Sequence, residues 1–377
     1  MRILTVSAFF ESHGGGVEIV AGALARVLAK RGHDSFITGA AFDAPPVDPT
    51  ITAVPLPSRD PIERYIGLPM PIPTMEARER LALEVAAADA IIIHDSLYIS
   101  SILAARAASR LHKPWILVQH IGAIPYSSPV LRTALAAVNV AVTRRMLNGA
   151  SHAIFISGEV QRHFEGVRYL HSPRLMFNGV DKSLFHYPQA RDRDAAQAEF
   201  GLRVPSRLRL LFVGRFVEKK GLAALRELAI KRPDCEFILV GDGPINPASW
   251  GLQNVTLLGR RTRQELARLY RACDGLVLPS VGEGYPLVVQ EALASGLSVY
   301  CGLDSAAADP GAAPFLRGIA VDPKNPKFTA RLFDEAIAAY PPAVNASAAA
   351  YASAQYDWDR NAQEIEAMIA AVSREKN

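Results

Sequence analysis

The chain has 377 residues, of which 50% are hydrophobic and 21% charged, and its formal net charge is +4. This composition excludes a disordered tail, and the length is enough for two domains of ordinary size, each with its own core. The charge is too small, and too evenly interleaved with acidic residues, to indicate a nucleic-acid partner; it fits an anionic ligand or an anionic lipid surface.

The cysteines and the first residues are typical of a cytoplasmic protein. Cys235, Cys273 and Cys301 are far apart and lack metal-ligand spacing, as expected of reduced thiols. Residues 2–10 have an apolar strand pattern without the charged leader and cleavage site of a secretory signal. We therefore expect a cytoplasmic location.

One apolar stretch, residues 133–143, bears on membrane contact. It is shorter than the roughly 20 apolar residues that a spanning helix needs, and Arg132, Arg144 and Arg145 flank it. We interpret it as a buried helix, with a helix lying in the membrane interface as the alternative. Association with the inner face of the plasma membrane is thus a further hypothesis.

Short apolar runs alternate with longer amphipathic stretches in the first half of the chain. Three- and four-residue spacing of apolar residues predicts helices over 17–32 and 100–113. Strand–helix alternation with near-continuous apolar strands predicts a parallel sheet covered on both faces. The predicted strands are residues 2–9, 34–38, 90–95, 114–120 and 152–157.

The alternation pauses over residues 172–202, where an Asn-Gly turn, prolines and a charge run predict a connector with a short helix. It then resumes and ends with an amphipathic helix. We predict domains over 1–180 and 181–355, followed by a C-terminal helix over 356–377. The later strands are residues 207–215, 235–243, 254–260, 275–280, 297–302 and 318–322.

Open parallel sheets bind ligands at the carboxyl ends of their strands. After the first strand come Gly14, Gly15 and Gly16, and a helix begins near Val17. Glycines let backbone N–H groups approach a phosphate, and a helix N-terminus adds partial positive charge. The spacing is neither G-x-G-x-x-G nor a Walker A loop, so it indicates neither a dinucleotide nor an ATPase site. A simple strand-to-helix turn is the alternative.

A second loop, after the strand that ends at Val213, combines Gly214 and Arg215 with Lys219 and Lys220. A guanidinium and an ammonium group there could converge on a diphosphate. The alternative is a solvated pair of loop charges.

Two further strand ends could line the same pocket. Gly241 and Gly243 would let a flat base or a ribose lie against the backbone, with an ordinary turn as the alternative. Arg260 repeats the strand–Gly–Arg pattern in residues 254–260.

The stretch "VGEGYPLVVQEALASG", residues 281–296, follows a predicted strand, and a helix is expected to start near Pro286. The N–H groups of Gly284, Tyr285, Leu287 and Val288 then lack intrahelical partners and can meet an anion.

Two carboxylates bracket this helix start. Glu283 lies just outside it, and Glu291 lies about 7.5 Å further along the helix axis. That separation matches the distance from a diphosphate to a ribose, so one carboxylate could contact a sugar and the other the ribose. A surface salt bridge is the alternative for Glu291.

These motifs make the sequence similar to the retaining glycosyltransferases of family 4, which have the GT-B fold of two facing Rossmann-like domains with a central cleft. The resemblance rests on "GGGVE", "FNGVD", "FVGRFVEKKG", "LVGDGP", "PSVGEGYPLVVQEALASG" and "YDWDR". They occur in the family's order over nearly the whole chain. The resemblance implies an α/β chain with an acceptor-side domain first, a donor-side domain second, and a C-terminal helix that packs back toward the first.

The resemblance also implies roles for the charged residues. Arg215 and Lys220 would bind the donor's diphosphate, with Lys219 a weaker candidate than Lys220. Glu283 would contact the donor sugar, and Glu291 the ribose.

The remaining assignments by resemblance concern backbone groups and one histidine. The segment Gly284, Tyr285, Pro286 and Leu287 would hold the distal phosphate and sugar, while Gly15 and Gly16 close over the diphosphate. His120 matches a histidine beside the sugar by its position after a strand, with His94 as the competing candidate.

The implied reaction is hexose transfer, with retention, from a nucleotide-diphosphate sugar to a glycan or lipid-linked acceptor. Front-face attack is favoured because no carboxylate occupies an obvious nucleophile position, and the leaving diphosphate would take the acceptor's proton. We expect no cofactor and no metal, because the Asp-x-Asp of residues 191–195 lies in the connector.

The acceptor is the least determined partner. The candidate acceptor loops, residues 57–80 and 124–133, carry no transferable signature, although their apolar and basic residues suit a lipid-linked or membrane-proximal acceptor. We expect a role in cell-envelope, lipopolysaccharide or exported polysaccharide synthesis. The alternatives are a sugar-nucleotide epimerase of the same architecture and a non-catalytic nucleotide-sugar-binding subunit.

Overall fold

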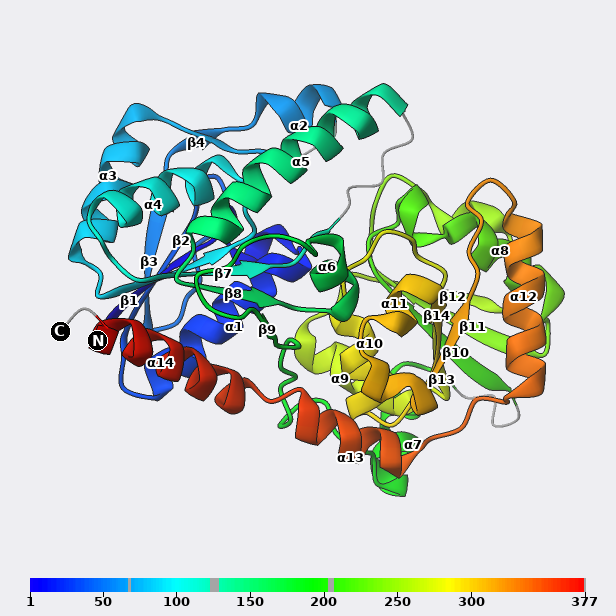
Figure 1. Cartoon of the computed structure of the whole chain (residues 1–377). Helices are drawn as coiled ribbons and strands as arrows, with labels where there is room; N and C mark the ends of the chain where they lie inside the picture. The colour runs from blue at the N-terminus through cyan, green and yellow to red at the C-terminus, as the bar shows by residue number, and fades with distance from the viewer. Residues whose placement is uncertain (67–68, 123–128, 203–206, 376–377) are drawn as a thin grey trace. The chain divides into compact units, whose positions relative to one another are not determined.

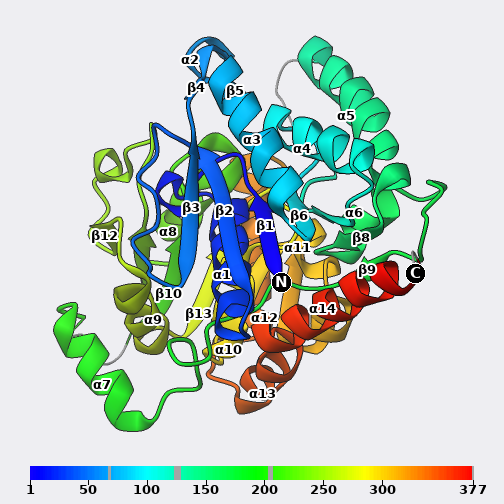
Figure 2. The same cartoon turned by 90° about the vertical axis from the view of Figure 1, so that its left-hand side faces the viewer.

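The computed structural model describes residues 1–66, 69–122, 129–202 and 207–375. The chain divides into two compact units: Met1–Gly179 with Trp358–Asn377 (unit 1), and Val180–Asp357 (unit 2). In each unit helices surround one parallel sheet (Figure 1; Figure 2). The predicted α/β class with two parallel-sheet domains is therefore confirmed.

The sheet of unit 1 has the strand order β3-β2-β1-β6-β7-β8-β9, and every neighbouring pair is parallel. The order reverses beside β1, which lies between β2 and β6. A small antiparallel pair, β4 (Ser58–Arg59) with β5 (Ile72–Pro73), stands apart from it. The main strands are β1 Arg2–Val6, β2 Asp34–Ala40, β3 Ile51–Leu56, β6 Ala90–His94, β7 Trp115–Gln119, β8 His152–Phe155 and β9 Arg174–Leu175.

Helices cover both faces of this sheet, because alternate strand residues point to opposite sides. Leu4 and Val6 pack with residues of α3, α4 and α5, whereas Ile3 packs with α1 and α14. The helices of unit 1 are η1 Glu11–His13, α1 Gly16–Lys30, α2 Pro61–Ile66, α3 Met75–Ala87, α4 Ile99–Arg110, α5 Pro129–Gly149, α6 Gly158–His163 and α14 Trp358–Glu375.

Two segments of unit 1 differ from the sequence analysis. Residues 57–80, interpreted as a loop, also contain α2, the β4–β5 pair and the start of α3, whose Thr74 cap accepts a hydrogen bond from the Ala77 N–H at 3.3 Å. Residues 133–143 lie in α5 as a helix, but it is only partly buried, since Val138 and Val140 are exposed. Its apolar residues do not all reach the core.

Unit 2 repeats the topology of unit 1. Its six parallel strands have the order β12-β11-β10-β13-β14-β15, which reverses between β10 and β13. The strands are β10 Leu208–Val213, β11 Cys235–Val240, β12 Val255–Gly259, β13 Gly275–Leu278, β14 Ser298–Gly302 and β15 Leu316–Ile319. The helices are α7 Ala190–Glu199, η2 Glu218–Lys220, α8 Leu222–Lys231, η3 Pro247–Trp250, α9 Arg263–Ala272, α10 Leu287–Ala294, α11 Leu303–Ala307, η4 Pro310–Phe315, α12 Pro326–Ala339 and α13 Ala346–Gln355.

The C-terminal helix α14 belongs to unit 1, as expected. Ala362, Ile365 and Ile369 are buried in the core beneath β1, β6 and β7. At the rim, Glu366 accepts hydrogen bonds from Arg31 at 2.8 Å and lies 2.8 Å from the His33 imidazole. The hydrogen bond from Arg31 is the main reason that the pKa of Glu366 falls from 4.5 to about 2.

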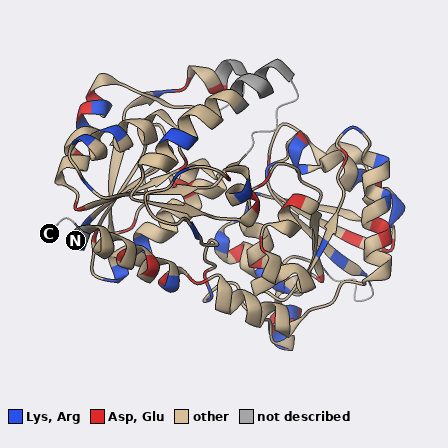
Figure 3. Ribbon diagram, in the orientation of Figure 1, with Lys and Arg blue, Asp and Glu red and all other residues tan. Residues whose placement is uncertain are grey.

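Charges of both signs are interspersed over both units (Figure 3). Across the described residues, no helix combines the length and the apolar character that crossing a membrane requires. The three cysteines are buried and unbridged.

We expect Glu366→Gln to lower the free energy of unfolding by about 1 kcal/mol at pH 7, because it loses a charge-assisted contact that is only partly exposed. A lowered pKa stabilises the fold above pH 4.5, and this stabilisation is lost as the pH falls toward 2. Urea unfolding between pH 7 and pH 2 should therefore show the two curves converging. Glu364→Gln, on the exposed side of the same helix, is the matched control; an equal loss there would contradict the assignment.

Candidate functional site

The candidate site of unit 2 lies where its strand order reverses, between β10 and β13. At such a point the loops that leave the two strands diverge and open a crevice at the carboxyl edge of the sheet. Residues 214–221 follow β10 and lead into α8, and residues 279–286 follow β13 and lead into α10. Both segments were singled out from the sequence.

These two loops touch through their backbones. Gly221 has a left-handed backbone (φ 73°), and a Cβ there would lie 2.1 Å from the carbonyl oxygen of Pro279. The Val281 N–H also donates to the carbonyl of Lys219 at 3.0 Å. Only glycine permits this approach, which fixes the start of α8 against the turn that precedes α10.

The contact brings two predicted ligand-binding side chains together. Lys220 Nζ lies 2.9 Å from Glu283 Oε1, and both side chains are about 15% exposed (14% and 15%). The stem of Lys220 passes 3.5 Å from the position of a Cβ on Gly214. Arg215 lies on the same loop and is exposed. Lys219 lies near the same groups: burial lowers its pKa, and the charges of Glu283, Lys220 and Arg215 also act on it. The site therefore presents three cationic side chains and one carboxylate.

The turn after Glu283 presents backbone donors. Pro286 is the N-cap of α10, and the first helical hydrogen bond runs from the Val289 N–H to its carbonyl at 3.0 Å. The N–H groups of Leu287 and Val288, one and two residues after this cap, thus have no carbonyl partner within the helix and are placed as predicted. α10 begins one residue beyond the expected start.

Tyr285 anchors this turn with its side chain. Its ring is 3% exposed, and its hydroxyl lies 2.7 Å from that of Tyr356, which in turn donates to Asp309 Oδ2 at 2.8 Å. Burial raises the pKa of both tyrosines, so both phenols stay protonated at neutral pH. A ligand at this turn would therefore meet the backbone of Gly284 and Tyr285 and not the phenol.

Glu291 is buried. It therefore does not form the surface salt bridge that was considered as its alternative role. It is 3% exposed, with Arg263 Nη2 3.3 Å from Oε1 and the Tyr270 hydroxyl 3.4 Å from Oε2. Burial raises its pKa, and Arg263 opposes this. The sequence pattern did not indicate Arg263 or Tyr270, although Arg263 lies only three residues after the predicted Arg260.

The remaining residues of unit 2 that were predicted to contact the donor are Gly241, Gly243 and Arg260. A Cβ on Gly241 would lie 2.0 Å from the carbonyl oxygen of Gly214, and one on Gly243 2.6 Å from that of Phe216. The absence of side chains there is thus required by the packing of the chain on itself. Arg260 is 61% exposed and 3.9 Å from Asp242.

Unit 1 carries a second set of polar groups at the reversal of its own strand order. Gly15 is the N-cap of α1 and Gly16 its first residue. The side chain of Glu18 folds back over this turn, since a Cβ on Gly15 would lie 2.1 Å from Glu18 Oε2. Glu18 is 4% exposed, and its burial raises the pKa. The sequence analysis did not single it out.

His120 and its competitor His94 are in contact with each other. His94 Nδ1 lies 3.0 Å from His120 Nε2, and both rings are buried. Burial lowers the pKa of His94 to about 3 and also lowers that of His120, so both are neutral at pH 7. Asp95, with φ 58°, accepts hydrogen bonds from the N–H groups of His120 at 3.0 Å and Ile121 at 3.3 Å.

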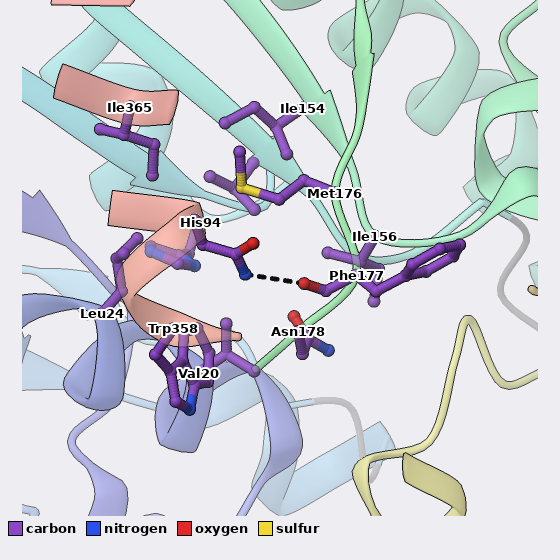
Figure 4. Close-up of a pocket in the computed structure, with 12 residues that line it drawn as sticks. Val20, Leu24, His94, Ile154, Ile156, Met176, Phe177, Asn178, Trp358 and Ile365 are labelled. Atoms are coloured by element: carbon purple, nitrogen blue, oxygen red, sulfur yellow. Dashed lines mark hydrogen bonds between the residues drawn. The ribbon is translucent and has the colours of Figure 1, made fainter. Parts of the chain in front are cut away.

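His94 is one of the residues that line a small cavity (Figure 4). Its volume is about 20 Å³, which is room for one water molecule and far too little for a nucleotide. Beside it the Asn361 side chain donates to the carbonyl of Phe177 at 2.8 Å. The cavity is lined mainly by apolar groups, including Val20, Leu24, Val118, Ile154, Met176, Trp358 and Ile365. It is therefore no candidate for a donor site.

The two parallel-sheet units, each with polar groups at its reversal point, define an α/β chain of the GT-B class. The structure of sucrose-phosphate synthase from Thermosynechococcus elongatus aligns with a TM-score of 0.75 and 18% identity over 99% of both chains. That of Anabaena HepE in complex with UDP and glucose aligns with a TM-score of 0.71 and 20% identity over 98% of this chain and 99% of that one. The predicted GT-B fold is thus confirmed.

Two protein-family models match this chain, one in each half of the sequence. Residues 14–184 match the model described as Glycosyltransferase Family 4, and residues 207–332 match the one described as Glycosyl transferases group 1. The chain therefore carries glycosyltransferase domains of these two kinds.

Curated relatives share part of the chain. D-inositol 3-phosphate glycosyltransferase of Mycolicibacterium smegmatis is 31% identical over 52% of this chain and 46% of its own length. An uncharacterized glycosyltransferase of Methanocaldococcus jannaschii, MJ1178, is 33% identical over 32% of this chain and 31% of its own. The chain thus spans less than half the length of these relatives.

We expect Gly221→Ala to destabilise unit 2 by about 3 kcal/mol or more, because the methyl group meets the Pro279 carbonyl and the residue also keeps a left-handed backbone. Gly251→Ala is the matched control, with a similar φ of 64° and no atom within 4 Å of the added Cβ. It should cost only about 1 kcal/mol. Calorimetric unfolding of both variants measures the difference; equal losses would show that the contact is unimportant.

Proposed function

We propose that the protein is a retaining glycosyltransferase that moves a hexose from a nucleotide-diphosphate sugar to a hydroxyl group of a glycan or lipid-linked acceptor. The proposal is carried by the Lys220–Glu283 contact, at 2.9 Å, beside the free N–H groups of α10 and at the reversal of strand order. The two glycosyltransferase family models support it. So does HepE, a fold neighbour whose structure was solved with UDP-glucose.

The charges of unit 2 suit a diphosphate. Lys220 is paired with Glu283, and Arg215 is exposed. A diphosphate can bind both cations and the N–H groups of residues 284–288. Glu283 is then left to accept hydrogen bonds from sugar hydroxyls, and Glu291 those of the ribose. Gly15, Gly16 and His120 of unit 1 keep their expected donor contacts as part of the proposal.

The chemical step follows from these roles. The acceptor oxygen forms a bond to the anomeric carbon on the face from which the diphosphate leaves, so the configuration is retained. The bond from that carbon to the phosphate oxygen breaks, and the leaving oxygen takes the acceptor's proton. Negative charge grows on the diphosphate as this bond breaks. Arg215, Lys220 and the amides at the start of α10 lower the barrier because they are already oriented toward that charge.

Metal independence is part of the proposal. The Asp-x-Asp of residues 191–195 lies within helix α7, away from any strand end. Asp192 there accepts a hydrogen bond from the Gln189 N–H at 3.2 Å and caps the helix. The work of neutralising the diphosphate is therefore assigned to arginine, lysine and backbone N–H groups.

The acceptor side is assigned to unit 1, near the membrane. Of its candidate loops, residues 67–68 and 123–128 lie outside the described residues. The described part of α5 exposes Val138 and Val140 together with Arg144 and Arg145, a combination that suits an anionic lipid surface. A fold neighbour, WaaG, is a glycosyltransferase involved in lipopolysaccharide biosynthesis. We therefore place the enzyme in envelope or exported polysaccharide synthesis, at the inner face of the plasma membrane.

Two other functions share this architecture. A sugar-nucleotide epimerase would need acid and base groups at a ring carbon, whereas the polar groups of unit 2 are arranged for a diphosphate. A non-catalytic subunit would bind the donor without turnover. Release of nucleoside diphosphate from UDP-, ADP- and GDP-sugars in the presence of a glycan acceptor separates the transferase from both.

We expect Arg215→Ala and Lys220→Ala each to lower transfer by about 100-fold or more, because each removes a cation that stabilises the leaving diphosphate. The thermal unfolding temperature should stay close to that of the unmodified protein. Lys231→Ala, which removes an exposed lysine paired with Asp334 in the same unit, should leave transfer unchanged. Nucleoside diphosphate release measures all three, and unchanged turnover in Lys220→Ala would refute the assigned role.

A further inference from the structure

Both oxygens of the buried Glu291 carboxylate already have a protein partner. Oε1 lies 3.3 Å from Arg263 Nη2, and Oε2 lies 3.4 Å from the hydroxyl of Tyr270. That hydroxyl has one hydrogen and also lies 3.2 Å from the Val288 carbonyl oxygen, so Arg263 is the stronger of the two partners. A carboxylate offers about four acceptor positions. The positions that remain can accept hydrogen bonds from a ligand with a restricted direction, because the contact with Arg263 limits the orientation of the carboxylate plane.

Arg263 is itself held in place. It is the first residue of α9, after a Thr262 cap that accepts from the Glu265 N–H at 3.3 Å. Its guanidinium carbon lies 5.3 Å from the centre of the buried Phe185 ring, which packs edge-on against Tyr270. The Arg263 side chain remains 40% exposed. The Arg263 side chain thus extends from the solvent to the buried carboxylate of Glu291.

Arg263 is the cation that acts on Glu291. The elements packed against α10 are α9, α13, β13 and β14, and β13 has no titratable side chain. The interactions that shift the pKa of Glu291 are burial first, then Arg263 and Tyr270. The other titratable groups on these elements are Glu265, Arg268, Arg271, Tyr300, Cys301 and Tyr351.

We propose that Arg263 is the positioning residue that makes Glu291 selective for a ribose diol, so that the site binds ribonucleotides in preference to deoxyribonucleotides. This inference rests on the proposed function, in which unit 2 binds a nucleoside diphosphate. It assigns no catalytic role to Arg263. Its effect is exerted through Glu291, which the cation keeps ionised and oriented.

The physical reason is the cost of a buried, uncompensated charge. Without Arg263, burial favours the protonated carboxyl group, which loses acceptor capacity and is free to rotate. With Arg263, the carboxylate can accept from both vicinal hydroxyls of a ribose. A site built to bind a hydroxyl group discriminates strongly against a ligand that lacks it, because its own polar groups are then left unpaired.

The test compares the affinities of a nucleoside diphosphate and its 2′,3′-dideoxy counterpart by calorimetric titration at pH 7 and pH 9, using whichever of UDP, ADP and GDP binds most tightly. The unmodified protein should prefer the ribonucleotide by about 100-fold at both values. Arg263→Met keeps the apolar stem against Phe185 but removes the charge. Its preference should fall below about 10-fold at pH 7 and be larger at pH 9 than at pH 7.

The direction of this pH effect follows from the pKa of Glu291. Burial raises it and Arg263 lowers it, so removing Arg263 raises it further. The carboxyl group of the variant is then protonated up to a higher pH than in the unmodified protein, so its preference should rise with pH. Arg263→Lys should keep most of the preference at pH 7. Arg268→Ala, on the same helix and paired with the exposed Glu199, should behave like the unmodified protein.

Each contrary outcome has one meaning. If Arg263→Met keeps the full preference at pH 7, Arg263 does not position Glu291. If it loses the preference at both pH values and Arg263→Lys does too, Arg263 itself contacts the nucleotide, and the inference is wrong. If the unmodified protein binds no nucleoside diphosphate, the proposed function fails and the inference fails with it. Thermal unfolding of each variant shows that these losses do not reflect misfolding.

Discussion

The site of unit 2 depends on one close approach, that of Gly221 to the carbonyl oxygen of Pro279. The loops involved leave adjacent strands whose connections run in opposite directions, so without a direct contact they would separate. Because residue 221 has no side chain, the backbones meet and Lys220 comes within 2.9 Å of Glu283. The start of α10, where the N–H groups of Leu287 and Val288 lack a carbonyl partner within the helix, is fixed by the same contact. Backbone packing thus sets where the ionic groups can be.

The two glutamates of residues 281–296 differ because their surroundings differ. Glu283 stands in a turn that remains partly open to solvent, where a lysine compensates its charge and a ligand can exchange with it. Glu291 lies in a helix whose neighbouring apolar side chains are buried, and its charge is compensated by Arg263 from another helix. An ionised group in such surroundings is stable only with a partner of opposite charge. The first carboxylate is therefore exchangeable, and the second is a fixed acceptor.

The sequence alone predicts most of the strands and the two loops of unit 2, because near-continuous apolar runs, glycines and a turn before a helix are local signals. It does not find Arg263, Tyr270 or Glu18, since their importance arises from contacts with residues far along the chain. The pairing of His94 with His120 shows the same limit: His94 ends β6 and His120 follows β7, and only the sheet order makes them neighbours. Gly241 and Gly243 show another limit of prediction from the sequence. Glycine is needed both where a turn packs against its own chain and where it packs against a ligand, so the residue type does not distinguish the two cases.

Because α14 belongs to unit 1, the hydrophobic cores of the two units cannot be completed in the order in which the units are synthesised. Unit 2 is continuous, so all its residues have been made once Asp357 is added. Unit 1 still lacks Ala362, Ile365, Met368 and Ile369, which complete one face of its sheet. Until they emerge from the ribosome, this apolar sheet face is covered by α1 alone and stays partly exposed. The part of the protein that is translated first is thus the last to finish its core.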